Sequence, residues 1–177
     1  VGTVNVNAGI FETFTNEAVT VDAVLASAAI PELFRAVEIH GHLHWDGLFS
    51  QNPPIDDLMG LPEPKPEELW VIQVNPQEFD GEPSTTEVIA DRRNELSGNI
   101  ALNQELRFIE QVNEWIETGK LPADEFTQTE IHRIQMGQRF HCSTKVDRSP
   151  DFISTLQELG RERATEFLSE RESRQSS

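Results

Sequence analysis

The chain has 177 residues, enough for one domain with a hydrophobic core, and its formal net charge at pH 7 is −17. Such a surface repels the phosphate backbone of nucleic acids, which excludes general nucleic-acid binding. With 37% hydrophobic and 25% charged residues the composition is that of a folded globular protein, and no apolar run approaches the about 20 residues that would span a bilayer.

The first forty residues predict two strands and a short helix. Residues 1–7 alternate apolar and polar side chains, the period-2 pattern of a strand, and residues 10–14 continue in an extended pattern. Thr20 is a suitable N-cap for a helix that ends at Pro31. We expect its apolar face, packed on a sheet, to consist of Val21, Val24, Leu25 and Ala28.

Further strands are predicted on both sides of a proline-rich break. Residues 38–45 read as two extended arms that turn at Gly41, and the segment 52–54, Asn-Pro-Pro, stops regular structure. The run LWVIQV at residues 69–74 is almost continuously apolar. This pattern is typical of a central parallel strand buried on both faces.

The rest of the chain predicts two long helices with one strand between them. Residues 84–87 have the form of a capping box, and a 3.6-residue periodicity then continues to Gly119, with a possible break near Gly98. Residues 130–136 alternate as a strand does, and Ser149-Pro150 begins a second helix that Gly160 would kink or end.

Alternation of strands and helices predicts the α/β class with a mainly parallel sheet. We expect one domain, with a sheet region over residues 1–82 and a mostly helical region over residues 83–177. No internal repeat interrupts this order.

Asp46 is the first candidate for chemistry. It precedes Gly47 in what reads as a tight, glycine-supported turn, beside Trp45, Leu48 and Phe49. An Asp-Gly pair is a strong turn signal by itself. A carboxylate in apolar surroundings is also a base for a serine hydroxyl within about 3 Å, because desolvation raises its pKa toward working pH. The residues alone leave both interpretations open.

The surroundings of Asp46 carry a resemblance to a known family. The segments ASAAIPELF (26–34) and VEIHGHLHWDGLFSQNPPI (37–55) resemble the second signature block of patatin-like phospholipases, in which A-S-x-A-I-P precedes a hairpin with D-G and then N-x-P. The match is close over residues 1–75. The later segments RRNELSGNIALNQELRFIEQVNEWI and KVDRSP look like the C-terminal region of a bacterial-type subset of the family.

The resemblance implies a three-layer α/β sandwich and a serine acyl hydrolase that cleaves lipid esters through a Ser–Asp dyad, without cofactor or metal. Asp46 lies where the family has the dyad aspartate, with Gly47 as its partner in the motif. The other matching positions, which would support the motif or line the pocket, are Ser27, Pro31 and Asn52.

One family element is missing from this sequence. The nucleophile of the family lies in G-x-S-x-G on a strand–turn–helix, and no such motif occurs here; Ser97-Gly98 has Glu95 in place of the first glycine. We therefore expect the chain to be the C-terminal portion of one patatin-like domain. The serine and the oxyanion hole would come from an N-terminal segment, which would also cover a free sheet edge.

Two functions follow from this. The first is a lipid acyl hydrolase in which this chain, inactive alone, supplies Asp46. The second is a non-catalytic interaction module that keeps the hydrolase-like scaffold. In it, the long helix that follows residues 84–87 and ends at Gly119 would offer a partner-binding face.

Weaker alternatives remain at other residues. Ser27 as a nucleophile would need a sharp elbow but lies in a helical pattern. The spacing of His40, His42 and His44 would suit zinc on a straight strand, but a turn at Gly41 would disperse them.

The sequence contains little information about the cellular location of the protein. The single cysteine, Cys142, excludes an internal disulfide, and a reducing cytoplasm is the default expectation, with peripheral contact to a membrane as the alternative. The acidic surface also raises the hypothesis of adaptation to high salt. The sequence predicts no oligomeric state.

Overall fold

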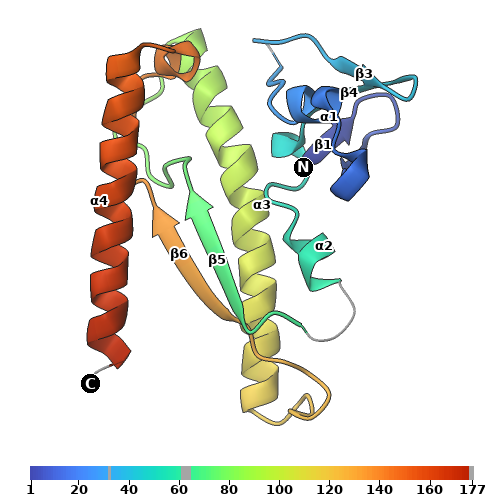
Figure 1. Ribbon diagram of the computed structural model, residues 1–177, viewed down its shortest axis with the longest axis vertical. Coiled ribbons are helices and arrows are strands. Elements are labelled where there is room, and N and C mark those ends of the chain that lie inside the picture. Colours follow the sequence, from blue (N-terminus) through green and yellow to red (C-terminus); the bar gives the residue numbers. More distant parts are fainter. Residues whose placement is uncertain (32, 61–64, 176–177) are drawn as a thin grey trace. The chain divides into compact units, whose positions relative to one another are not determined.

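The computed structural model describes residues 1–31, 33–60 and 65–175, which form a mixed arrangement of strands and helices (Figure 1). The predicted α/β class with long C-terminal helices is confirmed. By its internal contacts the chain forms two compact units, Val1–Glu67 with Arg93–Thr129 and Glu68–Arg92 with Glu130–Ser177. The predicted division at residue 82 stays a prediction.

The first unit contains a four-stranded sheet with the order β2-β1-β4-β3. All three pairings in it are antiparallel, so the expectation of a mainly parallel sheet is wrong here. Short connections account for the pairings of β1 with β2 and of β3 with β4, because neighbouring parallel strands need a crossover of a dozen or more residues. The strands are β1 (Gly2–Asn5), β2 (Ile10–Thr13), β3 (Val37–Ile39) and β4 (His42–Asp46).

The turn between β3 and β4 lies where the sequence predicted it. Ile39 pairs with His42, which leaves His40 and Gly41 as a two-residue loop. Both have positive φ, 53° and 80°, as a type I′ hairpin turn requires. The hairpin therefore fixes the register of β4, the strand that ends at Asp46.

Helix α1 (Val21–Ala26) packs against this sheet through a face that the sequence did not predict. Thr20 caps it as expected, since its Oγ1 accepts the Ala23 N–H at 3.2 Å. Ala23 and Ala26, however, are fully buried with Ile39. The predicted apolar residues point to solvent, with exposed fractions of 76% for Val21, 49% for Val24 and 56% for Leu25.

Alanine explains this choice of face, because its small side chain lets the helix backbone lie close to the sheet, whereas valine and leucine would hold it away. The helix also ends at Ala26, five residues before Pro31. A pattern of apolar residues could not distinguish the two faces.

Helix α3 (Thr86–Glu117) is continuous through Gly98, so the possible break is absent. Its N-cap is Thr85, whose Oγ1 accepts the Val88 N–H at 3.3 Å, and it is closed by Gly119 at φ 71°, as predicted. Residues 93–117 of α3 belong to the first unit, where they bury Leu102, Leu106, Ile109 and Ile116. Helix α2 (Ile55–Met59) lies in the same unit.

The second unit is built on a parallel pair, β5 (Glu68–Gln73) and β6 (Glu130–Gln135), with α4 (Pro150–Gln175) beside β6 (Figure 1). The predicted parallel pairing of residues 69–74 is thus confirmed, but burial on both faces is wrong. Side chains of β5 alternate, with Trp70 42% and Ile72 76% exposed.

Helix α4 begins as the sequence predicts and then continues further. Ser149 caps its N-terminus and accepts the Phe152 N–H at 3.4 Å through Oγ, and the helix runs through Gly160 without interruption. Among the described residues, no helix combines the length and the apolar character needed to cross a membrane.

Candidate functional site

Asp46 is the last residue of β4 and lies opposite Thr3 of β1. It then caps a short 3-10 helix, Gly47–Phe49, because its Oδ1 accepts the Leu48 N–H at 2.9 Å. Its own N–H donates to the Ala29 carbonyl at 3.1 Å. The sequence predicted a tight turn at this point, whereas the structure has a strand that passes directly into a helical turn. One backbone hydrogen bond therefore holds the carboxylate, and another holds the main chain of the same residue.

Burial sets the electrostatics of this carboxylate. Asp46 is half-buried, and desolvation raises its pKa above the ordinary value of 3.8, while the hydrogen bond from Leu48 partly offsets the increase. Among the described residues no cation pairs with it. Asp46 therefore combines restricted motion with increased basicity, the properties a general base needs.

Gly47 supports the site through close packing. Its φ lies outside the left-handed region, but a Cβ added here would lie 3.2 Å from the backbone carbonyl of Gly2 and 2.9 Å from the Phe11 ring. The glycine lets the end of β4 contact the start of β1 directly.

The other predicted support residues lie on the segments before and after β4. Ser27 is the C-cap of α1, and its Oγ donates to the Val24 carbonyl at 2.9 Å, a structural role. Pro31 is half-buried and lies two residues after Ala29, whose carbonyl accepts the Asp46 N–H. Asn52 is half-buried in the loop after the 3-10 helix, and its peptide bond to Pro53 is cis. The Ala29 carbonyl, which lies between Ser27 and Pro31 in the sequence, thus connects this segment to Asp46, a contact that no sequence motif predicts.

Neither serine considered in the sequence analysis has the geometry of a catalytic nucleophile. Ser97 lies inside α3, where its Oγ donates to the Arg93 carbonyl at 3.0 Å. Ser27 is engaged in the same way with its own helix. A nucleophilic serine instead sits on a strained turn that exposes the hydroxyl.

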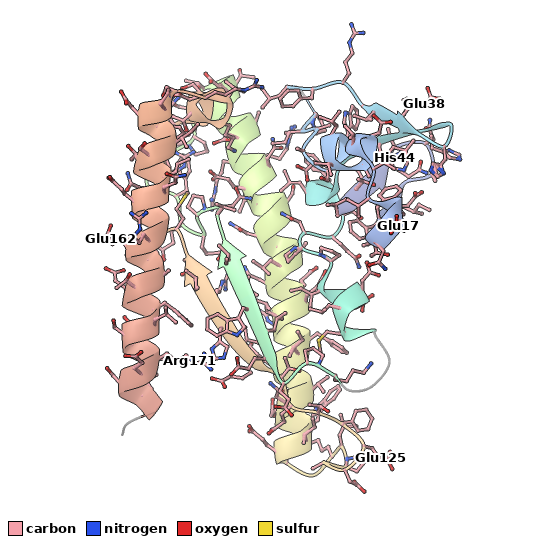
Figure 2. All side chains as sticks on the ribbon, viewed as in Figure 1. Glu17, Glu38, His44, Glu125, Glu162 and Arg171 are labelled. Carbon is pink, nitrogen blue, oxygen red and sulfur yellow. The ribbon has the colours of Figure 1, made fainter. Side chains whose placement is uncertain are left out.

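The turn at His40 and Gly41 separates His40 from His42 and His44, which both lie on β4. His40 and His42 are exposed, while His44 is buried and its Nε2 lies 3.2 Å from Oε2 of Glu12 (Figure 2). Asn5 and His44 hold the pKa of Glu12 below its ordinary value, the hydrogen bond from Asn5 having the larger effect. The three histidines do not form a metal-binding cluster among the described residues.

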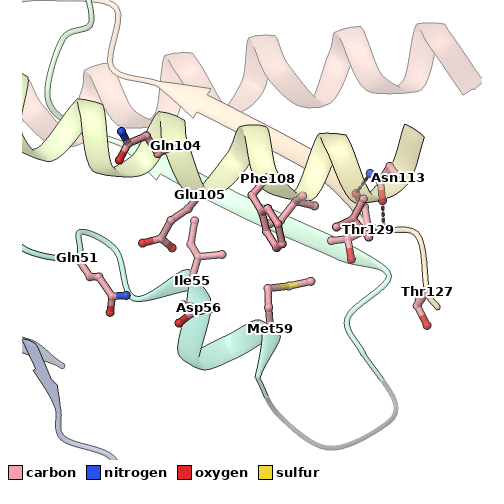
Figure 3. Close-up of a pocket in the computed structure, with 12 residues that line it drawn as sticks. Gln51, Ile55, Asp56, Met59, Gln104, Glu105, Phe108, Asn113, Thr127 and Thr129 are labelled. Atoms are coloured by element: carbon pink, nitrogen blue, oxygen red, sulfur yellow. Dashed lines mark hydrogen bonds between the residues drawn. The ribbon is translucent and has the colours of Figure 1, made fainter. Parts of the chain in front are cut away.

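A second feature of the first unit is an apolar cavity of about 280 Å³ lined by α2 and α3 (Figure 3). Ile55 and Met59 of α2 face Phe108 of α3 across it. At one end, the side chain of Asn113 donates to the Thr129 carbonyl at 2.8 Å and accepts its N–H at 3.0 Å.

Glu105 is a charged residue in the lining of this cavity that the sequence analysis did not single out. Its carboxylate points from α3 toward the first turn of α2, where the backbone N–H groups of Asp56 and Ile55 favour its charged form (Figure 3). Its Oε2 is buried without a hydrogen-bond partner in the described structure, and burial raises its pKa. A glutamate within an otherwise regular helical pattern gives no sequence signal for this role.

Comparison with known proteins agrees with the motif analysis. The family model for patatin-like phospholipases matches residues 3–59, the N-terminal part of this chain, which includes α1, Asp46 and α2. No curated protein matches the chain. At the level of the family, the match indicates a hydrolase of lipid esters.

Proposed function

We propose that this chain, whose residues 3–59 match the patatin-like phospholipases, supplies the general base of a serine-dependent lipid acyl hydrolase. The family match is the observation that carries the proposal. It covers Asp46 and the segments that hold it.

Asp46 would accept the proton of a serine hydroxyl as the oxygen attacks the ester carbonyl of the lipid. As the tetrahedral intermediate collapses, the protonated Asp46 returns its proton to the leaving oxygen, which departs as the alcohol and leaves an acyl-serine. Asp46 then accepts a proton from the water that attacks the acyl-serine, and it returns that proton to the serine oxygen as the free acid leaves. The restricted carboxylate and its raised pKa support this role, because a base is most effective when its pKa is near the working pH.

The serine and the oxyanion hole would come from an N-terminal segment of the same domain, outside this sequence. The absence of G-x-S-x-G among the 177 residues supports this part of the proposal. With that segment the domain would form the three-layer sandwich expected for the family. Within the described residues β2 and β3 are the edge strands of the four-stranded sheet, where such a segment would pair. The mechanism needs no cofactor.

The cavity between α2 and α3 would hold part of the acyl chain. Ile55, Met59 and Phe108 make its walls apolar, as binding of a hydrocarbon chain requires, and α2 begins nine residues after Asp46. Phe108 is 64% exposed, so the cavity has an open wall through which a chain can enter.

The test is to produce the chain joined to an upstream segment that carries G-x-S-x-G and to measure hydrolysis of p-nitrophenyl decanoate. The joined protein should cleave the ester. Asp46→Asn should lower kcat about 10²–10⁴-fold, the usual contribution of a general base. Asp124→Asn, an exposed carboxylate in a loop, is the matched control and should leave the rate unchanged.

Full activity in the Asp46→Asn variant would overturn the assignment. A folded joined protein without any esterase activity would instead favour the interaction module, which the missing nucleophile motif also supports.

A further inference from the structure

The second unit contains a cluster of two carboxylates and an imidazole that the proposed hydrolase does not use. In the parallel register, Glu68 lies opposite Glu130 and Trp70 lies opposite His132. Residues two apart on a strand point to the same face of a sheet, so all four side chains share one face.

His132 is buried, with an exposed fraction of 6%, and its Nε2 has no hydrogen-bond partner among the described residues. This nitrogen is directed at two carboxylates, since it lies 3.7 Å from Oε1 of Glu68 and 3.7 Å from Oε1 of Glu130. Both distances exceed the about 2.7–3.2 Å of a hydrogen bond. A buried polar atom without a partner is costly, which indicates an occupant between the three groups.

We propose that Glu68, Glu130 and His132 bind a divalent transition-metal ion, with Zn²⁺ as the ion that this donor set fits best. One ligand atom from each residue lies within 4.8 Å of the other two. Zinc bonds to nitrogen and oxygen are about 2.0–2.2 Å long, so ligand atoms around a tetrahedral ion lie roughly 3.3–3.5 Å apart. Small rotations of the two carboxylates would bring the ligand atoms from within 4.8 Å of one another to this shorter spacing.

The surroundings hold two of the three ligands in place. The His132 ring packs against Trp70, with ring centroids 4.7 Å apart, and against Phe167 at 6.1 Å. Glu68 accepts from the Trp70 indole at 2.9 Å and from Arg171 of α4 at 2.6 Å, and Arg171 points from the helix toward the strands (Figure 2). Metal ligands are characteristically oriented by such outer contacts.

The third ligand leaves the site accessible. Glu130 is 69% exposed, so an ion can enter from solvent and keep water in its fourth position. The two carboxylates and the Arg171 guanidinium together carry a formal charge of −1, which attracts a cation. The imidazole distinguishes the cluster from sites for Mg²⁺ or Ca²⁺, which prefer oxygen ligands. The sequence did not point to this cluster, because Glu68 and His132 are 64 residues apart.

Calorimetric titration of the EDTA-treated chain with ZnCl₂ tests the proposal. We expect one high-affinity site, and an increase in Tm when zinc is added, because the ion binds the folded state. Glu130→Gln changes an exposed side chain and should fold normally, but it should weaken zinc binding about 10-fold or more, as should His132→Gln. His42→Gln, an exposed histidine of β4, is the control and should bind zinc as the original chain does.

The proposal is overturned if the original chain shows no saturable zinc binding, or if Glu130→Gln binds zinc with unchanged affinity. Equal binding of MgCl₂ would also contradict it, because such binding would reflect acidic surface residues without a role for the imidazole. Circular dichroism of each variant without metal separates loss of ligand from loss of fold.

Discussion

At the scale of single residues, the hydrolase proposal depends on a carboxylate whose ionised form is disfavoured by its position. Burial raises the pKa of Asp46 above 3.8 in the folded chain. Above pH 3.8 the folded state therefore binds a proton at the Asp46 carboxylate more tightly than the unfolded state does. The contribution of Asp46 to the free energy of unfolding is therefore present at low pH and is lost as the pH rises through the pKa of the folded state.

Asp46→Asn should consequently raise Tm at pH 7, where the original carboxylate is charged. Asparagine keeps an oxygen that can accept the Leu48 N–H, so the cap is retained. The difference in Tm should shrink as the pH falls toward 4, which differential scanning calorimetry from pH 4 to 7 can measure. A variant less stable than the original chain at every pH would contradict this account.

The sequence predicted functional residues only where they are neighbours along the chain. Asp46 and Gly47 lie in one continuous motif, so a reader of the sequence can find them. Glu105 and His132 gain their significance from partners far along the chain, Ile55 and Glu68 respectively. Neither has a local pattern, because burial of a charge or an imidazole is decided by tertiary packing.

At the scale of elements, glycines with different surroundings give opposite predictions. Gly47→Ala should destabilise the chain by about 1–3 kcal/mol, because the new Cβ meets the backbone of Gly2. Gly160→Ala should stabilise it by up to about 1 kcal/mol, since Gly160 is exposed within α4 and a Cβ there meets nothing within 4 Å. Urea denaturation of the two variants measures both changes, and a change of the same sign in both would contradict the packing argument.

Element boundaries were predicted best where a backbone requirement selects the residue. Thr20, Gly41, Gly119 and Ser149 each satisfy a cap or a turn, and all four appear in those roles. Burial was predicted less well. The exposed Val21 of α1 and Ile72 of β5 look like core residues in the sequence, and only packing in the folded chain decides which face is covered.

At the scale of the whole molecule, charge is the dominant property. A formal net charge of −17 makes the folded state repel itself, and this repulsion is screened over about 10 Å at 0.1 M salt. Tm should therefore rise between 10 mM and 1 M KCl. Equal melting temperatures across that range would remove both the repulsion argument and the hypothesis of adaptation to high salt.

The two compact units are interleaved along the polypeptide, each assembled from two separate stretches. A fragment that stops at Glu67 lacks residues 93–129 of its own unit, and one that starts at Glu130 lacks β5, the parallel neighbour of β6. Neither half can be excised by a single cut. Limited proteolysis anywhere between these boundaries should accordingly release no autonomous piece, and the esterase and zinc assays both require the uncut polypeptide.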